Sequence, residues 1–593
     1  MRFESTSLPV LAILALSTLA GCPQVIEEEE PLPPCLSRAE LTNADFVAGL
    51  VLEAGSCWVA NERLSLDDGT VTVEEGVSIW FGTDIGLSVN TGGTLSINGT
   101  EANPVELSSS DPLVTWKGIE LSDSQGVDNR WSYVLIENGG SDNWTGANYS
   151  GAAVYLTGQT TLTMDAVTIR SSQSHGLVAL EEVQLTATDT AFEDNLTPAY
   201  MHVNGVEALG AETVFSNNTE PWVSVAFGNN DRISQPTTWH ALAVPIRVQT
   251  RFFVESDWTL DPGTVVEVEQ DVSIQLEPSG ALFAEGRSDA PIVFRGASAG
   301  TRGYWKGIEI KSGGTDDPVS YGALFDYVEI ADAGGDNWNG NSDSSAAVFM
   351  NSTSAALFTN TTFRNSGRYG LWASSEARID GFADNLFDGN ARAMRLHADR
   401  VGELSGTSVY TGNDEDRVHL GFGNNDRVSK AATWKNLGVP YELSERFYIA
   451  ADLSIEAGAI FEAAQDVDII VEVDGSLGGD GTATDPIVFR GVNPVNTGYW
   501  KGIEFRSNDA LNQFSNLELL HAGSDPWFGG PDANSSIYLA GGASLSLMDS
   551  TIGAGNRYGV IVRDDALLTC TGVDLSDSDG VFYTLTDSIL PDC

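Results

Sequence analysis

The chain has 593 residues, of which 83 are acidic and 30 are basic, giving a formal net charge of −53. A surface with this excess of negative charge repels nucleic acid and anionic lipid, and we expect neither as a partner. The length is too great for one ordinary compact core, and it fits several domains or one elongated repeat structure.

The first 21 residues have the composition of an export signal. Their apolar run from Leu8 to Leu19 is too short to span a bilayer, and it ends in LAGC at 19–22. This tetrapeptide resembles the lipobox of bacterial lipoproteins, in which cleavage precedes a cysteine whose thiol carries diacylglycerol. The resemblance implies a signal peptide at 1–21, a lipid on Cys22 and, with Pro23 next, anchoring in the outer membrane. A plain secretory signal with an unmodified cysteine is the alternative.

Residues 22–34 are acidic and proline-rich, which predicts a stiff solvated tether. Four more cysteines lie at the two ends of the remaining chain: Cys35, Cys57, Cys570 and Cys593. In an exported protein we expect two local disulfides, Cys35–Cys57 and Cys570–Cys593. Each would close a loop of about 22 residues and contribute roughly 3 kcal/mol in the chain-entropy model. Free thiols are the alternative, and a zinc site is not expected because no CxxC motif accompanies these cysteines.

One phrase occurs three times, as TWKGIEL at 115–121, YWKGIEI at 304–310 and YWKGIEF at 499–505. Its tryptophans, Trp116, Trp305 and Trp500, are 189 and 195 residues apart, and other landmarks repeat at nearly the same intervals. A fixed period of this kind predicts a repeat architecture. We expect three homologous units of about 190 residues, at 35–235 with an N-terminal cap, 236–430, and 431–593 with a C-terminal cap. The sequence leaves open whether they form one continuous coil or three butted segments.

A shorter period runs inside each unit. Ile169, Phe192 and Phe215 are 23 residues apart, and Asn195 and Asn218 each follow the preceding aromatic by three residues. Alternating segments such as TLTMDAVTI at 161–169 predict half-buried strands, and the Gly, Asn and Asp residues between them predict turns. Strands repeating at this interval describe a coil whose turns stack about 4.8 Å apart. Like residues should then form ladders, apolar inside and Asn or Ser at the bends.

These features resemble a known family. The combination of LxIxxG, a GxL…PxF stretch and WKGI is similar to bacterial cell-surface proteins with right-handed parallel β-helix repeats, in a superfamily that includes pectin lyase-like enzymes. The resemblance covers residues 60–590. It implies an all-β fold, a right-handed parallel β-helix solenoid, and it implies little about function because the roles of many members are unknown.

The tryptophan and glycine of the WKGI phrase are expected to pack one equivalent rung in each unit. The alternative is an exposed Trp-Lys pair that grips a sugar. In either case a triplicated phrase indicates architecture more directly than catalysis, because a catalytic motif normally occurs once.

The loop after each WKGI strand places an aspartate two residues before a tryptophan. These loops, at 139–151, 333–345 and 522–536, contain Asp142 with Trp144, Asp336 with Trp338, and Asp525 with Trp527. Aromatic faces beside carboxylates and amides suit stacking on sugars, or a Ca²⁺ ion held by oxygens. We expect the loops to project from the coil as binding sites. In the alternative, the tryptophan folds back over the coil and the aspartate caps a turn. No other cofactor is expected.

An enzyme would need convergent acid and base groups, for which the chain offers only weak candidates. Asp189 and Glu212 are 23 residues apart and could form a carboxylate pair for glycosidic chemistry, although chance stacking also explains them. His175, in SSQSHGL, is superficially similar to the Gly-His-Gly stretch of polygalacturonases. The other elements of that signature are missing, and the equivalent residues in the later units are Tyr369 and Tyr558.

The sequence therefore predicts a lipid-anchored surface protein without catalytic activity, with adhesion or binding of glycan or matrix through the Asp-x-Trp loops. Its expected partners are the membrane, through the lipid, and a polysaccharide or a surface protein. A polysaccharide lyase or glycoside hydrolase is the main alternative, and a purely structural spacer is the third. An enzyme should show one singular cleft, whereas a binding protein should show the same loop site three times.

Overall fold

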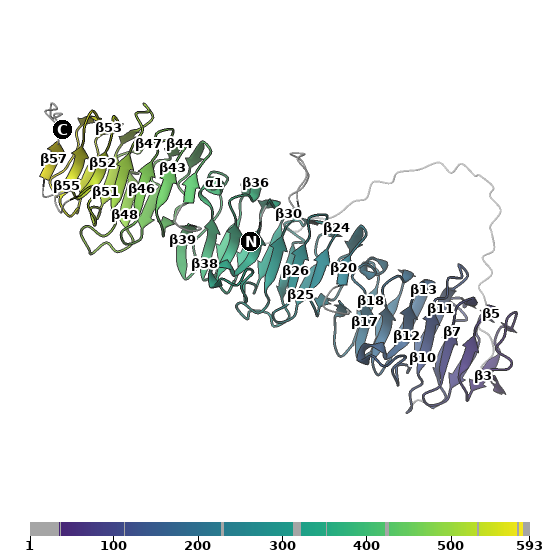
Figure 1. Cartoon of the computed structure of the whole chain (residues 1–593). Coiled ribbons are helices and arrows are strands. Elements are labelled where there is room, and N and C mark those ends of the chain that lie inside the picture. Colours follow the sequence, from purple (N-terminus) through teal and green to yellow (C-terminus); the bar gives the residue numbers. More distant parts are fainter. Residues whose placement is uncertain are drawn as a thin grey trace, which may run out of the picture.

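The computed structural model describes residues 35, 37–111, 113–226, 231–311, 322–351, 353–421, 426–529, 533–577 and 580–584. Within these ranges the chain winds into an elongated rod of short strands (Figure 1). The named strands pair in parallel with strands one turn away, which confirms a parallel β-helix. No helix in this described part of the chain is long and apolar enough to cross a membrane.

Two long sheets join the three units. Sheet I has 13 strands and runs from β4 (Leu64–Leu66) in the first unit to β37 (Leu386–Asp388) in the second. Sheet II also has 13 strands, from β20 (Asp231–Ile233) at the end of the first unit, through the second unit, to β54 (Thr551–Gly553) in the third. Sheet III has seven strands, from β40 (Asp426–Val428) to β57 (Gly580–Thr584). Because sheets I and II cross both junctions, the units form one continuous coil.

The WKGI strands of successive units belong to different sheets. The strand β10 (Gly118–Ser122) is in sheet I, β29 (Gly307–Ile310) in sheet II and β49 (Gly502–Phe505) in sheet III. In the second and third units the PxF strand belongs to a different sheet from the WKGI strand: β28 (Ile292–Gly296) is in sheet I and β48 (Ile487–Gly491) is in sheet II. The sheet that carries the WKGI strand in one unit therefore carries the PxF strand in the next.

The candidate site is positioned by the strands that come after each WKGI strand in the same sheet. In the first unit they are β12 (Ala152–Thr157), β14 (His175–Ala179), β17 (Thr197–Met201) and β19 (Val223–Val225); in the second, β32 (Ala346–Met350), β35 (Tyr369–Ala373), β38 (Arg392–Leu396) and β39 (Glu415–Leu420); in the third, β52 (Ser535–Leu539) and β55 (Tyr558–Val562). The short helices of the described chain are η1 (Asn148–Ser150), η2 (Val206–Ala208), η3 (Ser342–Ser344) and α1 (Ala398–Val401).

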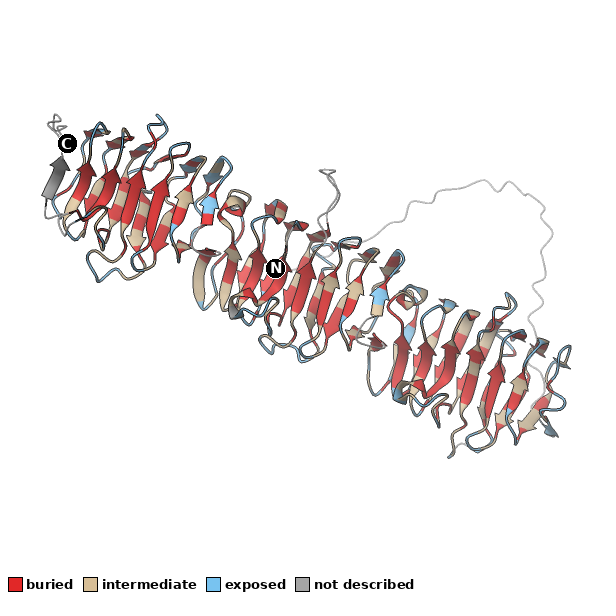
Figure 2. Ribbon diagram, in the orientation of Figure 1, coloured by how far each residue is buried: buried red, intermediate tan, exposed pale blue. Residues whose placement is uncertain are grey.

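The interior of the coil consists of the predicted ladders. Ile169 pairs with Phe192, which pairs with Phe215, and the two phenyl rings stack 5.7 Å apart. At the bend, Asn195 Nδ2 donates to the Oδ1 of Asn218 at 3.1 Å and to the carbonyl of Ile169 at 2.9 Å. The buried residues fill the inside of the rod along its length (Figure 2). The 23-residue period is thus one turn of the coil, because residues one period apart pair, stack or hydrogen-bond with each other on adjacent turns.

Of the two predicted disulfides, the structure describes the one at the start of the coil and one cysteine of the pair at its end. The disulfide Cys35–Cys57 is present, as predicted, and ties the start of the coil to β3 (Cys57–Ala60). Cys570 takes part in a disulfide, but Cys593 lies outside the described residues, so the pairing Cys570–Cys593 stays a prediction. The signal peptide, Cys22 and the tether also lie outside them.

Candidate functional site

The tryptophan of each WKGI phrase is a core residue. Trp116, Trp305 and Trp500 are each 0 % exposed. Each indole Nε1 donates to a backbone carbonyl at the end of the strand that precedes the adjacent loop: Glu137 at 2.8 Å, Ala331 at 2.7 Å and Leu520 at 2.8 Å. A buried indole needs such an acceptor. The packing interpretation of this tryptophan is confirmed.

The glycine of the phrase allows two turns of backbone to approach closely. Gly118, Gly307 and Gly502 have φ values of +112°, +122° and +119°, a conformation that other residues rarely adopt. A Cβ atom at these positions would lie only 2.4, 2.5 and 2.2 Å from a carbonyl oxygen of the next turn. The first and third letters of WKGI, the tryptophan and the glycine, therefore specify the rung itself.

The lysine of the phrase points outward and contacts the Asp-x-Trp loop. The Nζ atoms of Lys117, Lys306 and Lys501 lie 3.4, 3.4 and 3.6 Å from the aspartate Oδ2 of their own unit. They also lie 5.1, 4.9 and 4.7 Å from the centroid of the loop tryptophan ring, within the range of a cation–π contact. The phrase and the loop are thus two parts of one Lys–Asp–Trp constellation, which the chain builds three times. Sequence reasoning treated them as separate features.

The loop tryptophans lie back on their sheets and do not project. Trp144, Trp338 and Trp527 are half-buried, and each Nε1 donates to the carbonyl eight residues later, at 3.2, 3.3 and 3.0 Å. The structure thus has the arrangement given as the alternative, in which the tryptophan folds back over the coil, because this bond fixes the indole to the next strand. The aspartates do face solvent: the side chains of Asp142, Asp336 and Asp525 are 64 %, 54 % and 61 % exposed.

Each loop tryptophan is one end of an aromatic patch on the outer face of the WKGI sheet. Trp338 stacks on Phe349 at 5.8 Å, and Phe349 stacks on Trp372 at 4.3 Å. Trp527 stacks on Tyr538 at 5.7 Å in the same way. We define the three patches as Trp144, Tyr149, Tyr155 and Tyr200 in the first unit; Trp338, Phe349, Tyr369 and Trp372 in the second; and Trp527, Phe528 and Tyr538 in the third.

The patches occupy equivalent rungs. Tyr155, Phe349 and Tyr538 each pair with the glutamate of their own WKGIE phrase on the preceding turn. Burial raises the pKa of Tyr155, and it raises the pKa of Tyr200 to about 12. Both phenols therefore keep their protons at neutral pH and remain hydrogen-bond donors. Sequence reasoning missed these rung residues, although their place in the alternating pattern, outward on the strand after the loop, was available as a signal.

The weak catalytic candidates show no mutual interaction. The pairing of β16 (Ala191–Glu193) with β18 (Val214–Ser216) places Asp189 and Glu212 at equivalent positions of adjacent turns. Both are exposed, and no hydrogen bond or ion pair between these two described residues joins them. Asp189 has φ +46° and occupies a turn. His175 lies beside Tyr200, with the rings 5.2 Å apart, and its Nδ1 is buried without a hydrogen-bond partner. Burial lowers the pKa of His175 to about 4. It is a neutral packing residue at the edge of the first patch.

A cluster that sequence reasoning missed lies near the second patch. Glu415, His419 and Glu442 bring potential metal ligands within 4.8 Å of one another. Arginines already hold both carboxylates, with Arg392 3.0 Å from Glu415 and Arg417 3.1 Å from Glu442. Burial and the nearby guanidinium groups lower the pKa of His419 to about 3. The positive charges of these guanidinium groups disfavour a bound cation. Among the described residues, the Asp-x-Trp loops bring no comparable group of three ligands together.

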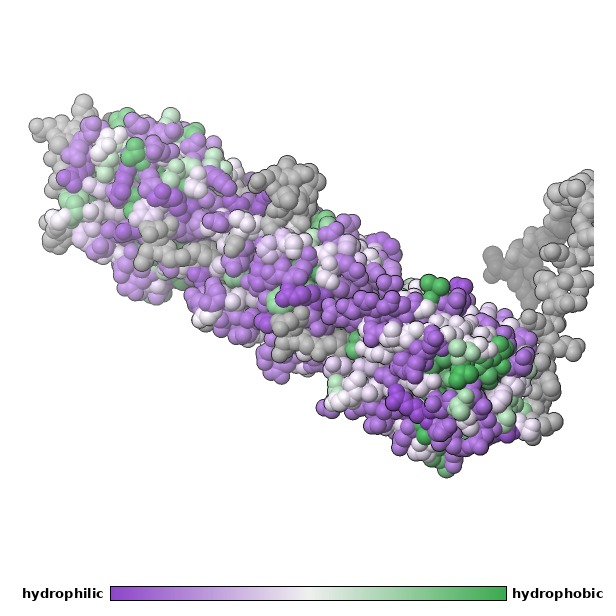
Figure 3. Space-filling view, turned by 45° about the vertical axis from the view of Figure 1, so that its right-hand side comes forward, coloured by the Kyte–Doolittle hydropathy of each residue, from purple (hydrophilic) through white to green (hydrophobic). Residues whose placement is uncertain are grey.

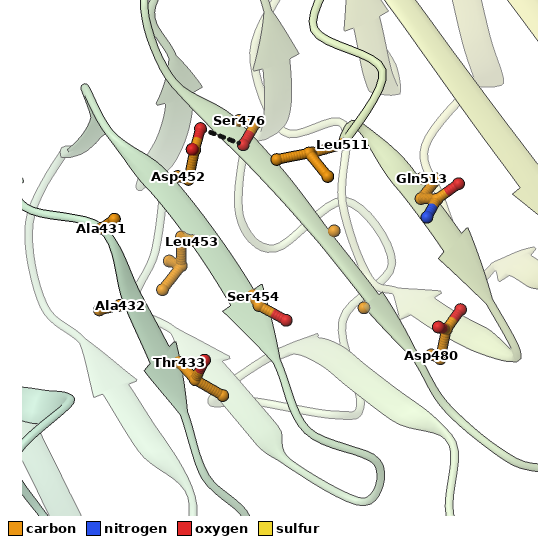
Figure 4. A pocket seen from close by; sticks show the side chains of 12 residues that line it. Ala431, Ala432, Thr433, Asp452, Leu453, Ser454, Ser476, Asp480, Leu511 and Gln513 are labelled. Atoms are coloured by element: carbon orange, nitrogen blue, oxygen red, sulfur yellow. Dashed lines mark hydrogen bonds between the residues drawn. The ribbon is translucent and has the colours of Figure 1, made fainter.

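One hollow of the described outer surface, of about 660 Å³, lies in the first unit, where Glu181, Glu182 and His202 help to line it. Another, of about 460 Å³, lies in the last unit on the six-stranded sheet that contains β44 (Asp452–Ile455) and β47 (Ser476–Asp480), which we call the third side of the coil (Figure 4). Asp452, Ser454, Gly478, Asp480 and Gln513 help to line it. Pairing through β44 and β47 puts Gly478 where the second unit has Phe283. The hollow exists because a glycine replaces this ring. It offers two aspartates but no His, Lys or Arg that could act as a base.

The molecule is thus an elongated parallel β-helix with three equivalent aromatic patches, each beside an exposed aspartate and a lysine. Figure 3 shows one face of the rod, where hydrophilic residues dominate and hydrophobic ones form small areas. No model of a known protein family matches this chain, and no curated protein is similar to it in sequence.

Proposed function

We propose that this protein binds glycans at the cell surface without catalysing a reaction, and that the three aromatic patches are the binding sites. The observation that supports this most directly is the Lys–Asp–Trp constellation, which recurs with nearly equal distances in all three units. The fold requires the buried tryptophan and the glycine of the phrase. It does not require an exposed aspartate beside each patch.

The chemistry of a patch suits a sugar. The solvent-facing part of each half-buried loop tryptophan offers an apolar surface for the C–H face of a pyranose ring. The aromatic side chains on the strand that follows, Tyr155, Phe349 and Tyr538, are buried and support the indole from below. The exposed aspartate can accept hydrogen bonds from vicinal hydroxyl groups, and the lysine can donate to ring or hydroxyl oxygens. With a net charge of −53 the rod repels polyanions, so the glycan should be uncharged.

The proposal includes the anchor. A lipid on Cys22 would hold the chain at the outer membrane, and the tether at 22–34 would separate the rod from it. The LAGC sequence is the support for this part. Lipid attachment would be tested by mass spectrometry of the membrane fraction, with Cys22→Ala as the unmodified control.

A polysaccharide lyase or hydrolase has less support. No hydrogen bond or ion pair between the described residues Asp189 and Glu212 joins them, and His175 is a neutral, partly buried residue beside Tyr200. Neither the hollow of the last unit nor the hollow of the first unit is lined by a lysine or an arginine that could act as the base of a lyase. The triplicated site is what a binding protein is expected to show.

The test is a glycan array with the chain from residue 22, carrying Cys22→Ser so that it stays soluble, in calcium and in EDTA. The patch variant is Trp144→Ala, Trp338→Ala, Trp527→Ala. The matched control replaces one exposed apolar residue outside the patch in each unit: Val127→Ala, Val409→Ala, Leu567→Ala. We expect the control to bind and the patch variant to lose binding while its circular dichroism is unchanged. Retained binding by the patch variant would contradict the proposal, and no binding by the parent protein would remove the glycan function.

A further inference from the structure

We infer that the three patches bind a single extended polysaccharide chain together, so that the partner is a long uncharged polymer and not a short terminal sugar. This inference rests on the proposed function and adds to it the length and form of the ligand. It follows from the spacing of the patches, their orientation on the rod and their chemical equivalence.

The spacing follows from the strand pairings. From β10, sheet I continues through β12, β14, β17, β19, β22 (Ile246–Val248) and β25 (Val265–Val268) to β28, which is seven turns, and β29 follows on the neighbouring side. From β29, sheet II continues through β32, β35, β38, β39, β42 (Tyr441–Leu443) and β45 (Ile460–Ala463) to β48, again seven turns. With strands about 4.8 Å apart, successive patches lie about 35 Å apart along the rod.

The orientation of the patches needs its own argument, because the WKGI strands of successive units lie in successive sheets: sheet I, sheet II and sheet III. In an untwisted three-sided coil, this step would turn successive patches to different sides. Successive patches return to the same side of the rod if the coil rotates by one of its three sides over about seven turns. This needs roughly 16° of twist per strand, which is within the normal range of sheet twist.

In Figure 1 the WKGI sheets of the three units face the viewer: strands β10, β12 and β17 in the first unit, β26 (Ser273–Leu276) and β38 in the second, and β46 (Asp468–Val471) and β52 in the third. This is the arrangement that a compensating rotation produces. In the second and third units strands of the third side lie above them, such as β24 (Asp257–Leu260) and β44. In the first unit the label of β13 (Thr161–Arg170) lies there; this long strand joins the third side and the PxF side in one 12-stranded sheet. Strands of the PxF sheets lie below, such as β3, β25 and β48. The three units therefore present their sheets in the same order, and the patches form one line along one side of the rod.

Equivalent chemistry makes one polymer the fitting partner. Each patch offers the same lysine, the same exposed aspartate and an indole stacked or packed against the next aromatic rung. Three like sites in a line match a ligand whose own unit repeats along its length. Linked sites that one ligand can reach together raise the apparent affinity by 10²–10⁴ without any new contact.

The test measures binding to size-fractionated uncharged polysaccharides (dextran, β-glucan and galactomannan) by the soluble full-length mature chain. Three variants each keep one patch and carry Trp→Ala in the other two. On fragments shorter than about 35 Å, the parent protein should exceed each one-patch variant by no more than the statistical factor of about three. On long chains, the parent protein should bind at least about 100-fold more tightly than any of them.

A second measurement needs no variant. With the parent protein alone, affinity should rise in two steps as the fragments come to span two patches and then three, at about 35 and about 70 Å. A smooth dependence on fragment length, or only a threefold advantage on long chains, would overturn the inference while leaving the proposed function intact. Failure of the parent protein to bind fragments and long chains alike would overturn both.

Discussion

Replacing the buried indole of one WKGI phrase should open the coil locally. In Trp305→Ala, a side chain that is 0 % exposed is removed and the carbonyl of Ala331 loses its donor. Large-to-small changes of this kind cost about 3–5 kcal/mol, and an orphaned buried acceptor adds to the cost. We therefore expect a loss of about 4 kcal/mol. Trp305→Phe, which keeps most of the volume but not the donor, should lose about 1–2 kcal/mol.

Hydrogen exchange followed by mass spectrometry is the appropriate assay, because turns of a solenoid contact only their neighbours and open locally. Amides in β29 and β32 should exchange about 1,000-fold faster in Trp305→Ala, since 1.4 kcal/mol corresponds to a factor of ten. Those in β10 and β12 of the first unit should be unchanged. The half-buried Trp338→Ala is the matched control. If it destabilises the rung as much as Trp305→Ala, or if Trp305→Ala accelerates exchange by less than tenfold, the assignment of the two tryptophans to core and patch is wrong.

Three further predictions concern other parts of the rod. Gly307→Ala should lower the free energy of unfolding in urea by at least about 2 kcal/mol, because at φ +122° the new Cβ would lie 2.5 Å from the Ala347 carbonyl oxygen. The control Gly340→Ala, at φ +80° with open space around it, should lower it less, and the reverse order would contradict the prediction. Reducing the Cys35–Cys57 disulfide, or Cys35→Ser with Cys57→Ser, should lower stability by roughly 3 kcal/mol and expose β1 (Ala39–Glu40) to limited proteolysis, while leaving the third unit protected. The pKa of His419 falls from 6.5 to about 3 on folding, so its stabilising contribution is complete above pH 6.5 and decreases as the pH falls toward 3. We expect it to account for roughly 2–3 kcal/mol of acid destabilisation by pH 4.5, and His419→Gln should flatten the pH dependence of urea unfolding over that range.

The fold could be predicted because its signal is repetition. Ile169, Phe192 and Phe215 recur at one turn of the coil, and the structure stacks them as the period required. The disulfide Cys35–Cys57 followed from export and proximity in sequence. Continuity across the junctions could not be predicted, because it depends on which sheet each strand joins, and the repeats alone do not reveal that WKGI and PxF strands share sheet I.

The candidate site was only partly accessible from sequence. The Asp-x-Trp loops are visible as repeats, but the lysine that contacts each aspartate lies 25, 30 or 24 residues before it and meets it only at a corner of the coil. The direction of the indole is set by a hydrogen bond to a strand beyond the loop, which no local pattern encodes. Glu415, His419 and Glu442 meet across neighbouring turns whose equivalents in the first unit carry Glu220, Ser224 and Arg247, so the repeats gave no guide to the cluster.

The disulfide at the start of the rod has a mechanical consequence. Strands lie across the rod and their hydrogen bonds run along it, so a pull on the N-terminal end of the chain would peel the coil one turn at a time. The bond from Cys35 to Cys57 passes such a force directly to β3, which is held between β1 and β6 (Ser78–Phe81). The segment between the two cysteines carries no load. The first turn is therefore a covalent loop that bears no tension, and peeling must begin at β3, where a neighbouring strand on each side resists it.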